Sequence, residues 1–323
     1  MASPLRLRAA VLGASIALAA CTPDDTAVEL PPDADAFAEF GLEADVPFAF
    51  MPDDQFFMVV ESAIVDGERV PVDRVESSDP AIMAVDEGRP YLFTHAPGRA
   101  QLRYFSAEGE LLGEDTFEVA VPEEVVIVPL AAVLTAPSPV DAARAWEPGD
   151  LHVFRSTTVE AIPFHEDRRL IGYNTFHATD EGGAHLESTN AGAFLSPRFF
   201  FRLSSSGFGS TGEVALRYGE QVMVRARVFG AAQSDVAALE LVDHEGWIWA
   251  RAQGEAGEVV LGPQVAWNPR PADETEGDML RYDFDPDAEG FTVVTASYGG
   301  VSESIAVRMG DRSASTTRNS EEP

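Results

Sequence analysis

An internal repeat is the feature that most constrains how this chain can fold. Residues 98–104 (GRAQLRY) match residues 212–218 (GEVALRY), and residues 290–297 (GFTVVTAS) form a third copy. Each copy is followed by a glycine-containing turn and then by a segment in which apolar and polar residues alternate. Alternation with a period of two is typical of a strand with one buried face. A chain that repeats such a unit three times is expected to form a tandem array of similar domains.

The repeat extends upstream of these strands. Residues 57–79 align without gaps with residues 247–269, and the middle copy fits with one extra residue near Gly172. Each unit therefore runs through two strands, a variable segment, a glycine-led strand, a tight turn and a last strand. This is the order of an immunoglobulin-like sandwich. We expect an all-β fold of three tandem immunoglobulin-like β-sandwiches, in which the glycine before each late strand supplies a turn.

Helix signals are weak throughout the chain. No segment shows sustained 3.6-residue periodicity, and the best helical candidate is the short stretch 140–146. Strand patterns are frequent by comparison. Residues 222–228 alternate and place Val222, Val224, Ala226 and Val228 on one side of a strand.

One stretch of the first unit resembles a known domain family. Residues 77–86 (SSDPAIMAVD) and 96–102 (APGRAQL) resemble the group 2 bacterial immunoglobulin-like domains, whose signature is a Ser-Ser-Asp/Asn-Pro turn, a Val-Asp pair and Gly-x-Ala-x-apolar. The second unit keeps residues 178–180 and the Gly212 strand of this pattern, and the third keeps residues 265–267 and the Gly290 strand. The resemblance implies the sandwich fold. It implies little about function, since such domains serve as spacers, adhesin stalks and accessory modules.

The N-terminus has the features of an export signal. Arg6 and Arg8 precede an uncharged run over residues 9–20, which is too short to span a bilayer but fits a signal-peptide core. The run ends Leu-Ala-Ala-Cys, which resembles the lipobox of bacterial lipoproteins. We therefore expect cleavage between Ala20 and Cys21 and a covalent lipid on Cys21. Thr22 at the next position favours the outer membrane, and exposure to the periplasm or to the medium stays open.

These observations predict how the chain divides into a signal peptide that is removed and the segments of the mature protein. The segments are a lipoprotein signal peptide over 1–20, an acidic tether over 21–44, immunoglobulin-like domains over 45–122, 123–230 and 231–310, and a disordered tail over 311–323. The second domain is longer than the others and diverges most.

The charge and the cysteine content limit the classes of molecule that this chain is expected to bind. The chain has 22 basic residues, all of them arginine, against 54 acidic residues, which gives a net charge of -32. Nucleic acids and anionic headgroups would be repelled by this charge, so we expect contact with the membrane only through the lipid. Cys21 is the single cysteine, which leaves no partner for an intramolecular disulfide and no thiolate cluster for a metal.

No motif indicates catalysis. Residues 207–212 match G-x-G-x-x-G, but a dinucleotide site needs a helix next, and the following residues read as a strand. The sequence contains no G-x-S-x-G elbow and no lysine. We expect the protein not to be an enzyme and to need no cofactor besides the covalent lipid.

An acidic loop near the C-terminus has the spacing of a calcium site. Asp283, Asp285, Asp287 and Glu289 alternate along it. The loop lacks the glycine and the final acid of an EF-hand, so two readings stay open: a different calcium site, or an acidic loop in an acidic protein.

Two tryptophans are the other candidate site. Trp247 and Trp249 are two residues apart, so a strand would place both rings on one face, where they could form a platform for a sugar. The repeat alignment sets them against Phe57 and Val59, which favours a place in the core.

The function expected from these features is non-catalytic. The sequence predicts a lipid-anchored envelope protein. Its tandem domains are expected to act as a structural, spacer or adhesion-type module with a protein or polysaccharide partner. The alternative is a glycan-binding or small-ligand-binding lipoprotein, with calcium as a possible aid.

Overall fold

The computed structural model describes residues 48–57, 62–65, 68–86, 91–147, 149–172, 176–189, 198–269, 277–282 and 290–308. Strands dominate this part of the chain, and the expected all-β fold class is confirmed. The predicted signal peptide, Cys21, the tether and the tail lie outside the described residues. We group the strands into unit one (β1–β9), unit two (β10–β18) and unit three (β19–β25).

Unit one is a sandwich of two sheets. One sheet has the order β1-β9-β8-β5, the other has the order β2-β7-β6, and β3 pairs with β4. Leu92, Leu102 and Tyr104 are fully buried between the sheets. The strands are β1 (Phe48–Phe50), β2 (Asp54–Phe57), β3 (Ser62–Val65), β4 (Glu68–Pro71), β5 (Arg74–Ser77), β6 (Met83–Val85), β7 (Tyr91–Thr94), β8 (Gly98–Phe105) and β9 (Leu111–Val119).

Unit two repeats this arrangement and adds two helices. One sheet contains β11-β18-β17-β14, and the other contains β15-β16-β12-β13 with β10 paired to β12. The elements are β10 (Glu124–Pro129), α1 (Leu130–Leu134), α2 (Pro139–Ala145), β11 (Leu151–Val153), β12 (Ser156–His165), β13 (Arg168–Ile171), β14 (Phe176–Gly182), β15 (Ala184–Ser188), β16 (Phe199–Ser205), β17 (Thr211–Tyr218) and β18 (Gln221–Gly230).

The helices explain why unit two is the longest. Ser138 caps α2 by accepting a hydrogen bond from the Asp141 N–H, and Pro139 occupies the first helical position. Both helices pack apolar residues against the outer face of β10 and β12. Strand β12 is consequently buried on both faces over residues 159–164. The predicted helix at 140–146 corresponds to α2, whereas α1 was not expected from the sequence.

Unit three has the same core order in a shorter form. Strand β20 pairs with β19, β21 and β23, and a second sheet has the order β22-β24-β25. The elements are the 3-10 helix η2 (Gln233–Asp235), β19 (Ala238–His244), β20 (Trp247–Gln253), β21 (Val259–Leu261), β22 (Ala266–Asn268), β23 (Met279–Arg281), β24 (Thr292–Tyr298) and β25 (Val301–Val307).

Strand pairing shows that the three units share one topology. The strands β8, β17 and β24 each lie between an earlier strand (β5, β14 or β22) and the last strand of their unit (β9, β18 or β25). All three units are immunoglobulin-like β-sandwiches. The position of the glycine differs between copies: Gly98 and Gly212 already lie within β8 and β17, whereas Gly290 precedes β24. A Cβ atom on Gly212 would meet the backbone N of Ala184 at 2.4 Å.

Neither α-helix of the described residues is long and apolar enough to cross a membrane.

Candidate functional site

Strand β1 belongs to two units at once. It runs parallel to β9 of its own unit and parallel to β13 of unit two. At its end the Met51 N–H donates to the Ile171 carbonyl at 2.9 Å, and the Phe50 carbonyl accepts from the Ala120 N–H at 2.8 Å. The sheet therefore continues from unit one into unit two without a break.

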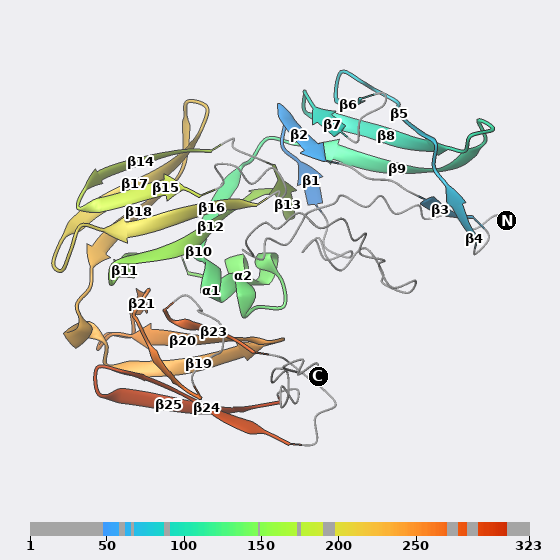
Figure 1. Cartoon of the computed structure of the whole chain (residues 1–323). Helices are drawn as coiled ribbons and strands as arrows, with labels where there is room; N and C mark the ends of the chain where they lie inside the picture. Colours follow the sequence, from blue (N-terminus) through green and yellow to red (C-terminus); the bar gives the residue numbers. More distant parts are fainter. Residues whose placement is uncertain are drawn as a thin grey trace, which may run out of the picture.

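Strand β11 makes the same connection at the next junction. It runs parallel to β18 of unit two and to β21 of unit three. The Phe154 N–H donates to the Leu261 carbonyl at 2.9 Å, and the Val153 carbonyl accepts from the Ala231 N–H at 2.9 Å. Figure 1 shows the result, with unit two lying between units one and three and joined to each through a short strand. Two long sheets thus carry the backbone hydrogen bonding across both junctions.

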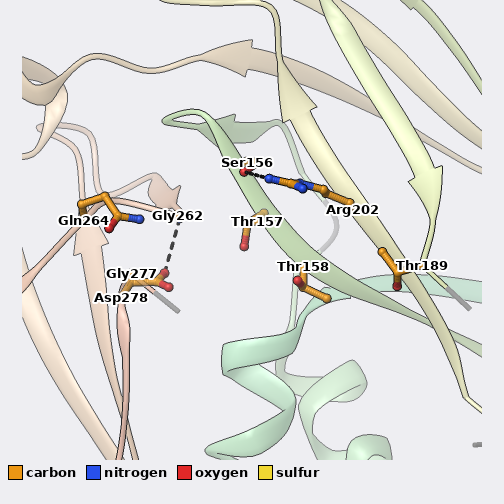
Figure 2. Close-up of a pocket in the computed structure, with 9 residues that line it drawn as sticks. All are labelled: Ser156, Thr157, Thr158, Thr189, Arg202, Gly262, Gln264, Gly277 and Asp278. Atoms are coloured by element: carbon orange, nitrogen blue, oxygen red, sulfur yellow. Dashed lines mark hydrogen bonds between the residues drawn. The ribbon is translucent and has the colours of Figure 1, made fainter. Parts of the chain in front are cut away.

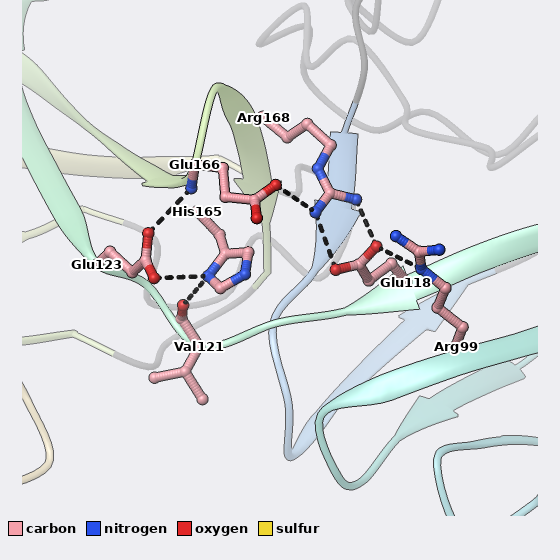
Figure 3. A network of polar contacts seen from close by, with 7 residues as sticks. All are labelled: Arg99, Glu118, Val121, Glu123, His165, Glu166 and Arg168. Carbon is pink, nitrogen blue, oxygen red and sulfur yellow. Dashed lines mark hydrogen bonds and ion pairs between the residues drawn. The ribbon is translucent and has the colours of Figure 1, made fainter.

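An ion-pair network closes the first junction (Figure 3). Glu118 of β9 accepts hydrogen bonds from both terminal nitrogens of Arg168 on β13, at 2.5 and 2.9 Å, and from Arg99 Nε at 3.0 Å. A fork-shaped pairing of this kind fixes geometry as well as charge. The hydrogen bonds from Arg168, and to a lesser extent the one from Arg99, lower the pKa of Glu118 to about 2. A salt link between units one and two therefore persists over most of the pH range.

The linker between these units is held by the same region. His165 Nδ1 lies 3.1 Å from the carbonyl oxygen of Val121 and 3.6 Å from Glu123. The Glu166 N–H donates to the Glu123 carboxylate at 3.1 Å, and the Glu123 N–H donates to the Phe164 carbonyl at 2.8 Å. The short connection from β9 to β10 consequently has little freedom to act as a hinge.

A polar cavity of about 330 Å³ lies at the second junction (Figure 2). Unit two contributes three adjacent hydroxyls at the start of β12 together with Thr189 and Arg202, and unit three contributes Gln264 and Asp278 beside two glycines. Arg202 donates to Ser156 Oγ at 3.3 Å. The described lining contains donors and acceptors but no aromatic ring, so the cavity is suited to a small polar molecule.

Asp278 connects this cavity to the main core cluster, which extends from unit two into unit three and contains Trp249. Its side chain is buried and accepts hydrogen bonds from Trp249 Nε1 at 3.2 Å and from the Gly262 N–H at 3.4 Å. The carboxylate is therefore held between the backbone that follows β21 and the buried ring of Trp249.

A buried ion cluster lies behind the first junction and has no signature in the sequence. Glu160 of β12 is 0% exposed and accepts hydrogen bonds from Arg169 Nη2 at 2.8 Å and Arg198 Nε at 2.9 Å. Arg169 belongs to β13, the strand that pairs with β1. A buried carboxylate requires such partners, because an unpaired charge in the interior is costly. The cluster thus fixes the strand on which the junction depends.

The two tryptophans predicted as a possible platform differ in exposure. Trp249 is only 3% exposed and packs in the core, whereas Trp247 is half-buried with the Arg281 guanidinium 5.6 Å from its ring centroid. A buried ring offers no face on which a sugar could stack, so Trp249 cannot belong to such a platform. Its position in the core agrees with the repeat alignment.

The other predicted sites lie outside the described residues. These are the cleavage site at Ala20 and Cys21 and the acidic loop with Asp283, Asp285, Asp287 and Glu289. Within the part of the chain that the structure describes, no three His, Cys, Asp or Glu side chains are placed to hold a metal ion.

Comparison with protein-family models and with curated proteins gave no match. Among solved structures, domains 4–9 of the surface layer protein SbsC align with 80% of this chain at 14% identity and a TM-score of 0.35. The Escherichia coli adhesin FdeC aligns with 82% of this chain and 95% of its own at 11% identity and a TM-score of 0.25. Invasin, a bacterial integrin-binding protein, aligns with 79% of this chain and 55% of its own at 9% identity and a TM-score of 0.24. The chain spans 45% of the SbsC fragment.

Proposed function

We propose that this protein is a non-catalytic, lipid-anchored envelope protein whose three sandwiches form one stiff structural or adhesion-type module. The observation that carries the proposal is the sharing of β1 and β11 between neighbouring units. Tandem domains usually move relative to one another unless their interface is extensive. Here one sheet continues across each junction, so bending would break backbone hydrogen bonds.

Both connections between units support this stiffness. The first is tied down at Ala120 and Glu123 by main-chain hydrogen bonds. In the second, the Ala231 N–H donates to the Val153 carbonyl at 2.9 Å, and the Ala232 N–H, just before η2, donates to the Asp235 carboxylate at 2.7 Å. A module of this kind holds whatever binds it at a set position relative to its anchor.

The anchor and its location rest on the sequence. In this proposal Cys21 carries the lipid, Thr22 directs the protein to the outer membrane, and the partner is a protein or a polysaccharide. The acidic surface disfavours nucleic acid.

Distances between spin labels test the stiffness directly. In a Cys21→Ser background, labelled cysteines replace the exposed residues Thr116 in unit one, Thr179 in unit two and Ser302 in unit three, taken in pairs. We expect the distance distributions between units to be as narrow as that of a control pair within unit two, Thr179 and Ser188. Broad distributions across either junction would overturn the proposal.

The cavity at the second junction favours a second candidate function, the binding of a small polar ligand such as a monosaccharide. The Trp249 indole N–H would report binding, because it shares the Asp278 carboxylate with the cavity wall. We expect its NMR signal to shift when single sugars are titrated into the native chain and to stay still in Arg202→Ala. An unmoved signal in the native chain would exclude the sugars that were tried.

Calcium binding at the loop with Asp283, Asp285, Asp287 and Glu289 is also a proposal, and it rests on the sequence alone. Added calcium should raise the melting temperature, and an unchanged melting temperature would count against the site.

A further inference from the structure

Strand β18 has an edge that its neighbour covers only in part. The strand runs from Gln221 to Gly230, but β11 pairs with it only over the last three residues, from Val228 to Gly230. Over residues 222–227 the only strand of the described chain paired with β18 is β17, on the opposite side. A groove of about 440 Å³ lies along this stretch, between β18 and β10.

The backbone of β18 faces this groove with hydrogen-bonding groups. The Gly230 N–H donates to the Ser210 carbonyl, and the Gly230 carbonyl accepts from the Gly209 N–H. Both partners lie in the turn that leads into β17, so the polar backbone groups of Gly230 point to the β17 side of the strand. Because the direction alternates along a strand, the N–H and C=O groups of Arg225 and Arg227 point the other way, into the groove. Open strand edges of this type are templates for an added strand.

Apolar side chains form the floor of the same groove. Val224 and Ala226 of β18 lie beside Val125 and Ile127 of β10, and all four pack on the main core of unit two. Val125 and Ile127 are buried, but Val224 and Ala226 stay partly exposed. Trp146 also lines the groove, and its Nε1 is buried with no hydrogen-bond partner among the described residues. The floor therefore matches the apolar face of an alternating strand.

The charged side chains around the groove indicate which charge a bound segment should carry. Arg225 pairs with Glu213 at 2.5 Å and Arg227 pairs with Asp150 at 2.8 Å, so both arginines are already neutralised. Glu124 of the rim adds a further negative charge, and the whole chain has a net charge of -32. A basic segment is favoured and an acidic one is repelled.

We propose that the groove between β10 and β18 binds an extended, basic segment of a partner protein as an added strand, with alternate apolar side chains on Val224 and Ala226. The added strand would continue the slot that β11 already occupies at the other end of β18. Main-chain hydrogen bonds would provide affinity, and the alternating pattern would provide selectivity. This inference goes beyond the stiff module, which needs no such groove.

Calorimetry with a synthetic peptide tests the proposal on the full chain. The probe is a peptide of about six residues that alternates valine and arginine, with both ends capped, a length that spans the open part of β18. We expect one peptide to bind per chain. A valine–glutamate peptide and an arginine–glycine peptide should bind at least about tenfold more weakly, because the first has the wrong charge and the second has no apolar face. Equal binding of the arginine–glycine peptide would overturn the proposal.

A matched pair of variants locates the site. Arg225→Pro removes the backbone N–H that faces the groove, and a proline is tolerated at an edge position. Arg225→Ala removes the side chain and its pair with Glu213 but keeps the N–H. We expect Arg225→Ala to bind at least as tightly as the native chain, because Glu213 loses its cation, and Arg225→Pro to bind at least about tenfold more weakly than Arg225→Ala. Equal affinity in both variants would refute the strand geometry.

A second substitution keeps the test decisive if Arg225→Pro does not fold. Ala226→Phe fills the groove with a side chain, whereas Thr179→Phe places the same ring on an exposed position of β14. Binding should disappear in the first variant and persist in the second. Label distances across the junctions are unaffected by the peptide result, so the stiff module and the groove can fail separately.

Discussion

The backbone N–H of Met51 donates to the carbonyl of Ile171 at 2.9 Å, and this bond joins the end of β1 in unit one to the end of β13 in unit two. Phe154 makes the corresponding bond to Leu261, also at 2.9 Å. The junction is thus repeated together with the sandwich. Because both partners are backbone groups, this joint tolerates the sequence divergence between units.

Gly262 should be needed at the second junction for steric reasons. Its φ is +71°, and a Cβ atom would lie 2.4 Å from the Ser156 carbonyl oxygen. We expect Gly262→Ala to lower the free energy of unfolding by about 2 kcal/mol or more in urea titrations. Gly109 is the control, since its φ is +82° but nothing lies within 4 Å of its Cβ position. Gly109→Ala should cost only the backbone strain, about 1 kcal/mol, so equal losses would contradict the clash.

Glu118 should stabilise the first junction at neutral pH and lose that role in acid. Its pKa falls from an ordinary value of about 4.3 to about 2, mainly through hydrogen bonds from Arg168. A carboxylate with a lowered pKa contributes fully above about pH 4.3 and loses its contribution as the pH falls towards 2. Glu118→Gln should therefore cost about 1 kcal/mol at pH 7 and progressively less below pH 4.

Unfolding in urea at several pH values measures this difference. Glu114→Gln is the control, because Glu114 forms a longer, exposed pair with Arg103 at 3.7 Å. The control should change stability very little at any pH. A Glu118→Gln deficit that is the same at pH 3 and pH 7 would show that charge is not its cause.

Glu160 should be much harder to replace than a surface acid. Glu160→Gln removes the buried carboxylate charge that Arg169, which is also buried, pairs with. Breaking a buried ion pair of this kind costs about 3 kcal/mol or more. Glu213→Gln breaks an exposed pair with Arg225 and should cost less than about 1 kcal/mol. Similar unfolding midpoints for the two variants would argue against an interior role for Glu160.

The two tryptophans on β20 should respond differently to truncation. Trp249→Ala removes a buried ring and its hydrogen bond to Asp278, and we expect a loss of about 3–5 kcal/mol. Trp247 is half-buried, so Trp247→Ala should cost clearly less. Acrylamide should quench the fluorescence of Trp247 more readily than that of Trp249. The contribution of each ring is the difference in quenching between the native chain and a variant in which that one tryptophan is replaced. Equal quenching would contradict the burial of Trp249.

Cys21→Ser should release the protein from membranes. Without the thiol no diacylglycerol can be attached, and the remaining chain offers no other expected membrane contact. The measurement is the distribution between membrane and soluble fractions, with Ser315→Ala in the tail as a matched control. A Cys21→Ser variant that stays wholly in the membrane fraction would refute lipid anchoring.

The sequence by itself determined the sandwich fold and its repetition. Apolar alternation and glycine-led strands depend on local sequence, because a half-buried strand needs one apolar face. The equivalent places of β8, β17 and β24 could therefore be predicted. Even there, a bulge at Met223 interrupts the alternation: Leu216 pairs with Val224 and Arg217 with Val222, so Val222 departs from the side predicted for it.

Only the tertiary structure decided how the units meet. Strands β1 and β11 have three residues each, and their partners lie far along the chain. Periodicity shows which face of a strand is apolar but not which edge it joins, because backbone hydrogen bonds are the same for every residue type. The burial of Glu160 and the open edge of β18 follow from the same cause: both depend on what the rest of the fold does or does not place beside a strand.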